Sequence, residues 1–210
     1  RGDMAAWERW GIGVVMIMFI AGLNIHGTRI VGRVAIAFTI FVLLPFIVLV
    51  LSGIHAVNLS LWAAKPATVE WGLLLSVMLW NTCGWDNAAC CAGEVRQPGS
   101  VFPKAMAATV VLVTVSYLLP VAVGVGVDRQ WGAWKEGHFP LVATQIGGPY
   151  LGTWLMVAGS VSAMGLFNSL LCTSARIPYA LARQKLLPSV FETLHPRFGT
   201  PWVAILVNSF

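Results

Sequence analysis

Long apolar runs dominate the pattern of this 210-residue chain. The windows 34–54 and 105–127 contain no charged residue, and a helix that crosses a bilayer needs about 20 mostly apolar residues. The window 150–175 is also uncharged but rich in Gly, Ser, Thr and Asn, which is typical of a helix packed among other helices. The pattern predicts membrane spans at about 11–25, 34–54, 71–93, 105–127 and 150–175, and the start of another at 201–210.

The span predicted over 71–93 contains a carboxylate, Asp86, although a charge at mid-membrane costs roughly 2.5–3.5 kcal/mol. Four poor helix formers, Asn81 to Gly84, come directly before it, and an aspartate after such a patch is a natural helix N-cap. We therefore expect half-helices over 71–80 and 86–95, joined by unwound backbone. Such backbone is tolerated at this depth only where it lines a protein-enclosed cavity, as in the substrate sites of secondary transporters.

Composition predicts an all-α polytopic membrane protein whose surroundings are a lipid bilayer. Hydrophobic residues make up 58% of the chain, charged residues 10%, and the mean hydropathy is +0.79, whereas about 25% of residues in soluble domains are charged. The 13 Lys and Arg are scattered singly, which argues against a nucleic-acid partner. The four cysteines lie in predicted spans without a zinc-binding spacing, so we expect buried thiols and no metal or cofactor. We expect the four histidines to be solvated loop residues.

The loops between the predicted spans differ in their basic residues. Eight Lys and Arg fall in one set of alternate loops, whereas five, offset by five acids, fall in the other set and the N-terminal lead. The richer set is expected in the cytoplasm, which places the loops 94–104 and 176–200 on that side. We expect a multi-pass protein that resides in the plasma membrane, of which this chain is an interior fragment.

Four groups of residues together resemble a known family. They are Trp80-Asn-Thr-Cys-Gly-Trp-Asp86 with Ala92-Gly-Glu-Val-Arg-Gln-Pro98 and Pro103-Lys-Ala, then Asn24-Ile-His-Gly-Thr-Arg-Ile-Val-Gly32, Ala182-Arg-Gln-Lys-Leu-Leu-Pro188 and Arg197-Phe-Gly-Thr-Pro201. In this order they resemble the amino acid-polyamine-organocation superfamily, and within it the plant and protozoan branch of polyamine:proton symporters and L-type amino acid permeases. The resemblance implies a five-plus-five inverted-repeat fold of twelve helices. This chain would hold helices four to eight and the start of nine, and would need helices one to three and ten to twelve of the same protein in order to transport.

The resemblance also implies roles for residues around the interruption. Asp86 falls where many relatives carry a Glu that is linked to substrate binding and proton coupling. Trp80 matches an aromatic that stacks over a cationic group of the substrate, although a Trp facing lipid or the core is the alternative. For Trp85, direct contact with the substrate competes with core packing or gating. Glu94, about 12 Å along a helix from Asp86, is expected to be a structural or gating carboxylate with Arg96 or Arg176 as its partner.

The remaining candidates are polar residues without a charge. Asn81, Cys83 and Gly84 are expected to line the substrate site because they form the unwound segment. In the span 150–175, Asn168 is expected to line the same path, as are Ser160, Ser162 and Ser169. Packing between helices is the alternative for each of these four residues.

The pattern of charge around the interruption favours a cationic substrate. No Lys or Arg occurs between Lys65 and Arg96, whereas Asp86 and Glu94 fall inside this interval. A polyamine carries ammonium groups and no carboxylate, so we predict proton-coupled uptake of polyamines such as putrescine and spermidine. An amino acid permease remains the alternative. A membrane-embedded transferase is a remote one, because no histidine lies near Asp86 in the sequence.

Overall fold

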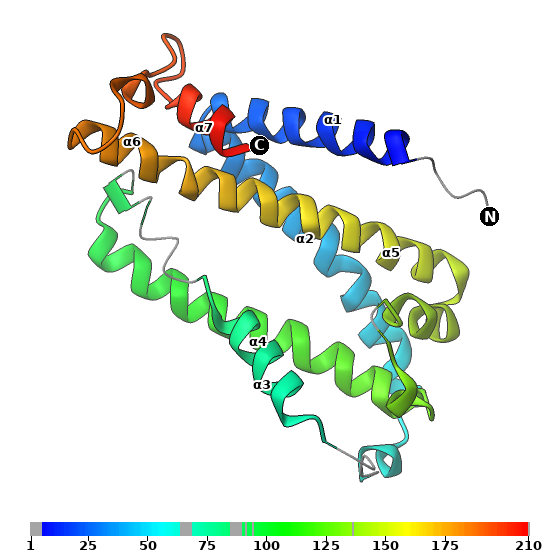
Figure 1. The fold of residues 1–210 in the computed structure, drawn as a ribbon. Coiled ribbons are helices and arrows are strands. Elements are labelled where there is room, and N and C mark those ends of the chain that lie inside the picture. Colours follow the sequence, from blue (N-terminus) through cyan, green and yellow to red (C-terminus); the bar gives the residue numbers. More distant parts are fainter. Residues whose placement is uncertain are drawn as a thin grey trace. The chain divides into compact units, whose positions relative to one another are not determined.

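The computed structural model describes residues 6–63, 69–84, 90, 92–93, 95–135 and 137–209. Within these ranges the chain is helical and contains no strand, which confirms the all-α class. The α-helices are α1 (Ala6–Ile25), α2 (Thr28–Gly53), α3 (Trp71–Thr82), α4 (Pro98–Val127), α5 (Phe139–Ser174), α6 (Arg176–Arg183) and α7 (Trp202–Ser209) (Figure 1). Short 3-10 helices occur at Ile54–Ala56, Leu59–Ala63, Trp131–Ala133 and Ser189–Glu192.

In the part of the chain that the structure describes, three helical stretches are long and apolar enough to cross a membrane: Thr28–Ala56, Pro98–Val127 and Phe139–Arg183. The last of these is not a single straight helix. Gly148 has φ 83° and ψ 177° and is followed by Pro149, so α5 is kinked there, because only glycine adopts such a φ readily and proline cannot continue the helical hydrogen bonds. The helix after the kink begins close to position 150, where the apolar window begins.

By contacts the chain divides into two compact units. The first contains α1, the start of α2, the end of α5, α6 and α7. Its core joins three helices that are distant in sequence, through Ile20 of α1, Leu171 of α5 and Ile205 of α7, together with Ala175 between α5 and α6. Because these apolar side chains are withdrawn from both water and lipid, packing fixes how the three helices of this unit meet.

The second unit contains the rest of α2, α3, α4 and the first part of α5. Its core includes Leu49 of α2, Val123 of α4 and Leu155 of α5. Glycines allow neighbouring segments to approach the end of α4 closely, since a Cβ at Gly126 would lie 2.7 Å from a methyl group of Val57. Small residues at such crossings are typical of packed membrane helices.

Candidate functional site: the end of helix α3

Helix α3 ends inside the apolar run, where the sequence predicts an interruption. The last helical residue is Thr82, Cys83 is extended with φ −83° and ψ 161°, and Gly84 has φ 88°. A residue with a side chain rarely adopts the φ of Gly84, so this glycine allows the chain to leave the helix axis. Trp85 and Asp86, the centre of the predicted site, lie outside the described residues, as do Glu94 and most of the predicted half-helix 86–95.

The described part of the predicted site lies on the last turn of α3 and just beyond it. Trp80 is 79% exposed, so its indole face is accessible in this unit, and Cys83 and Gly84 are also exposed. The Asn81 amide is fixed at both ends, because its Nδ2 donates to the carbonyl of Val77 at 2.8 Å and its Oδ1 accepts from the hydroxyl of Tyr117 at 3.0 Å. The structure thus adds Tyr117 of α4, which the sequence analysis did not select.

Asn168, the candidate on α5, belongs to the other unit and is fully buried there. Its Oδ1 accepts a hydrogen bond from Nδ2 of Asn24 at 3.1 Å, and Asn24 Nδ2 also lies 3.0 Å from the carbonyl of Ile20. This pair joins α1 to α5, while a role of Asn168 in lining the substrate path stays a prediction. The Nδ2 atom of Asn168 has no hydrogen-bond partner within the described part of the chain. The hydroxyl of its neighbour Ser169 bonds to the carbonyl of Gly165 on the same helix.

A carboxylate at the C-terminal end of α4 has a full set of partners. Asp128 is 8% exposed and accepts hydrogen bonds from the backbone N–H of Gln130 at 2.8 Å and the indole of Trp134 at 2.7 Å, while Nε2 of His138 lies 3.2 Å from the same carboxylate. Burial alone would raise the pKa of Asp128, but the hydrogen bonds and the nearby imidazole outweigh it and hold the pKa below its ordinary value of 3.8. His138 thus lies in the loop before α5, as expected, but its ring is half-buried and bound to Asp128 and not fully solvated.

The cysteines also correct an expectation. Cys172 is buried, but Cys83 and Cys90 are exposed. The predicted pairing of Glu94 lies outside the described residues, whereas Arg176 bonds to the carbonyl of Cys172. Within the described ranges, no three His, Cys, Asp or Glu side chains gather as a metal site would require.

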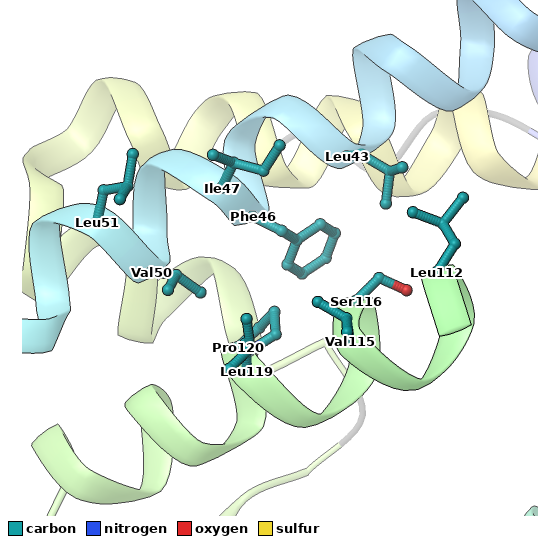
Figure 2. Close-up of a pocket in the computed structure, with 10 residues that line it drawn as sticks. All are labelled: Leu43, Phe46, Ile47, Val50, Leu51, Leu112, Val115, Ser116, Leu119 and Pro120. Carbon is teal, nitrogen blue, oxygen red and sulfur yellow. The ribbon is translucent and has the colours of Figure 1, made fainter. Parts of the chain in front are cut away.

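A cavity of about 280 Å³ lies between α2 and α4 in the second unit (Figure 2). Its lining is aliphatic and aromatic apart from Ser116, whose hydroxyl bonds to the carbonyl of Val113. Among the described residues, no carboxylate or free amide lines it, so an ammonium group there would be desolvated without compensation. The cavity is therefore a poor site for a cation, and none of the predicted site residues that the structure describes lines it.

Comparison with known proteins gives the family. Residues 2–210 match the family described as amino acid permease. The chain is 34% identical over 200 residues to polyamine transporter PUT1 of Oryza sativa subsp. japonica, and this alignment covers 94% of this chain and 37% of the relative. It is 32% identical over 200 residues to polyamine transporter RMV1 of Arabidopsis thaliana, covering 93% of this chain and 41% of the relative.

A bacterial relative is more distant. The serine/threonine exchanger SteT of Bacillus subtilis (strain 168) is 26% identical over 215 residues, covering 96% of this chain and 49% of the relative. The chain thus spans between about a third and a half of the length of these curated relatives. With three described helices long and apolar enough to cross a membrane and a family match over almost its whole length, the chain is part of an integral membrane protein and belongs to the amino acid permease family.

Proposed function

We propose that the protein to which this chain belongs takes up polyamines by proton-coupled transport, with putrescine and spermidine as substrates. The observation that carries the proposal is the end of α3 at Thr82 beside the exposed indole of Trp80, directly before the acid Asp86. An aromatic face attracts a cation, and a carboxylate neutralises it. The two plant relatives named as polyamine transporters support this choice.

Asp86 is assigned the central role in this mechanism. A carboxylate at mid-membrane can bind an ammonium group or a proton, but a single negative charge does not stabilise both at once. Competition between the two would couple amine release to proton binding. Trp80, Asn81, Cys83, Gly84 and Trp85 would line the substrate path, whereas Glu94 would gate its cytoplasmic end. The proposal gives these residues a role in transport and none in catalysis, and it places the protein in the plasma membrane.

Amino acid transport is the second candidate. The serine/threonine exchanger SteT and the glutamate/serine transporter AimA of Bacillus subtilis, at 26% and 24% identity, favour it. An amino acid brings a carboxylate, which needs N–H donors such as those at a helix N-terminus. In the interval between Lys65 and Arg96 this chain offers acids and no basic side chain, which suits a substrate without a carboxylate better.

Uptake by the full-length permease in liposomes tests the proposal. Labelled putrescine, spermidine and a panel of amino acids are offered with and without an inward proton gradient. We expect gradient-driven polyamine uptake that Asp86→Asn abolishes and that Asp86→Glu retains in large part, because glutamate keeps the charge. Glu192→Gln, which neutralises an exposed acid, is the matched control and should transport normally.

Two results would contradict the proposal. Uptake confined to zwitterionic amino acids would select the second candidate. Undiminished, gradient-driven polyamine uptake by Asp86→Asn would remove the assigned role of Asp86 while leaving the substrate class in place.

A further inference from the structure

A hydrogen bond joins the last turn of α3 to the middle of α4. The Tyr117 hydroxyl donates to Oδ1 of Asn81 at 3.0 Å, and Nδ2 of the same amide donates to the carbonyl of Val77, one turn earlier in α3, at 2.8 Å. The Asn81 side chain therefore connects a phenol on α4 with the backbone of α3. Figure 1 shows the two helices side by side.

This bond connects α3 to α4 through side chains close to the end of α3. All α3 residues from Trp71 to Asn81 are exposed, so within the described chain no buried side chain fixes how the helix is rotated. Directly after Asn81 the helix ends at Thr82 and the backbone turns away at Gly84. A contact at Asn81 thus acts on the point where the interruption begins, next to Trp80.

The position along α4 places the bond within the apolar part of the helix. Tyr117 lies ten residues before the end of α4 at Val127, which is about 15 Å along the axis. Polar side chains at such depth commonly make hydrogen bonds to neighbouring helices. The pair is also accessible, since Tyr117 is 55% exposed.

We propose that Tyr117 is a positioning residue of the transport site: through Asn81 it holds the last turn of α3 so that Trp80 and the interruption face the substrate in a binding geometry. The inference rests on the proposed transport function and adds a residue from a second helix to its site. Tyr117→Phe keeps the ring and removes only the hydroxyl, so Asn81 and the end of α3 lose their hold on α4 while the packing of the ring stays.

Transport kinetics of the full-length permease give the first test. Loss of one neutral hydrogen bond corresponds to roughly a 2- to 10-fold effect, so Tyr117→Phe should raise KM by that factor and leave the maximal rate and its pH dependence nearly unchanged. Ser116→Ala is the matched control, because it removes a hydroxyl from the neighbouring residue that bonds within its own helix. In an Asn81→Ala background, Tyr117→Phe should have no further effect, since the two residues act as one unit.

The native Cys83 provides a second test that does not need transport. It is exposed and lies two residues after Asn81, so its rate of alkylation by N-ethylmaleimide, followed by peptide mass spectrometry, reports the position of the end of α3. Tyr117→Phe should change this rate at least about twofold, Ser116→Ala should not, and the buried Cys172 is the internal reference. Where Tyr117→Phe folds poorly, Asn81→Ala should give the same change.

The outcomes separate the inference from the function on which it rests. A parent protein that takes up no polyamine contradicts the proposed function, and the Cys83 rate then still decides the role of Tyr117. The positioning role would be overturned if Tyr117→Phe left the alkylation rate of Cys83 unchanged or had the same KM as Ser116→Ala. It would also be overturned if the effects of Tyr117→Phe and Asn81→Ala multiplied, or if Tyr117→Phe displaced the pH profile of transport.

Discussion

Each of the two units contains an asparagine that links two of its helices. The two hydrogen bonds have almost the same length, but one asparagine is buried and the other is exposed. In the first unit Asn168 bonds to Asn24 at 3.1 Å and is fully buried. In the second unit Asn81 bonds to Tyr117 at 3.0 Å and is exposed. Hydrogen-bond length therefore does not distinguish a packing contact from a contact at a site. We use burial as the criterion, because within the described chain only the Asn81 amide is accessible to a substrate.

The cluster around Asp128 sharpens this comparison. It lies in the same unit as Asn81 and, like Asn81, at the C-terminal end of a helix, but it is buried and all its bonds go to neighbouring residues. Asp128 and Asn81 thus both lie at a helix end, but only Asp128 is buried. If burial decides, then Asp128 and Asn168 matter for stability and Asn81 matters for transport.

The largest effect on stability is expected from Asp128→Ala. The change leaves the N–H groups of Trp134 and Gln130 without their acceptor, and hydrogen bonds to a charged group contribute about 1.5–3 kcal/mol each. We expect the free energy of unfolding of the full-length permease in detergent to fall by about 2–3 kcal/mol. Glu192→Ala, at an exposed acid, should change it by less than about 0.5 kcal/mol. Equal stabilities for the two variants would contradict the assignment of Asp128 as a structural group.

Asn168→Ala should have the next largest effect. It removes a fully buried side chain and its bond to Asn24. We expect the free energy of unfolding to fall by about 1–2 kcal/mol. The loss should lie toward the lower end of this range, because hydrogen bonds between membrane helices average only about 0.6 kcal/mol. Ser169→Ala is the control, since its hydroxyl bonds within α5. A rise in KM with unchanged stability would instead place Asn168 on the substrate path, as the sequence analysis predicted.

Much of the fold could be predicted from the sequence, because a helix that crosses a membrane requires a long apolar run, which is visible in the sequence. The charge-free windows 34–54 and 105–127 lie almost wholly within α2 and α4, and the poor helix formers before Asp86 coincide with the end of α3 at Thr82. The start of α5 at Phe139 was not predicted. A Gly-Pro pair at 148 and 149 forms a kink between two consecutive helical segments.

The contacts of the candidate site could not be predicted in the same way. The bond between Tyr117 and Asn81 crosses 36 positions and that between Asn24 and Asn168 crosses 144, so both depend on how helices pack and not on local pattern. A single phenol in the uncharged window 105–127 was the available signal for Tyr117. For His138, the acid directly after that window was the signal. The roles of Trp85, Asp86 and Glu94 stay predictions.

Acid should weaken the Asp128 cluster by less than the Asp128→Ala change does. The pKa of Asp128 is lowered in the folded protein, so its carboxylate stabilises the fold at pH values above the ordinary pKa of 3.8. That contribution is lost as pH falls through the lowered folded pKa. We expect the thermal midpoint of the parent to fall more steeply below about pH 4 than that of Asp128→Asn, measured in the same detergent. Parallel curves for the two proteins would show that the carboxylate is not held in its charged form.

The smallest effect on stability is expected from Asn81→Ala, although it removes a hydrogen bond as short as that of Asn168. Exposed substitutions change the free energy of unfolding by no more than about 0.5 kcal/mol, and Asn81 is exposed like the rest of α3 from Trp71 onward. Unfolding of the full-length variant should thus coincide with that of the parent, while its KM rises as in Tyr117→Phe. A stability loss as large as that of Asn168→Ala would mean that the rest of the permease buries Asn81. The amide would then be a packing contact, and the contrast between the two asparagines would disappear.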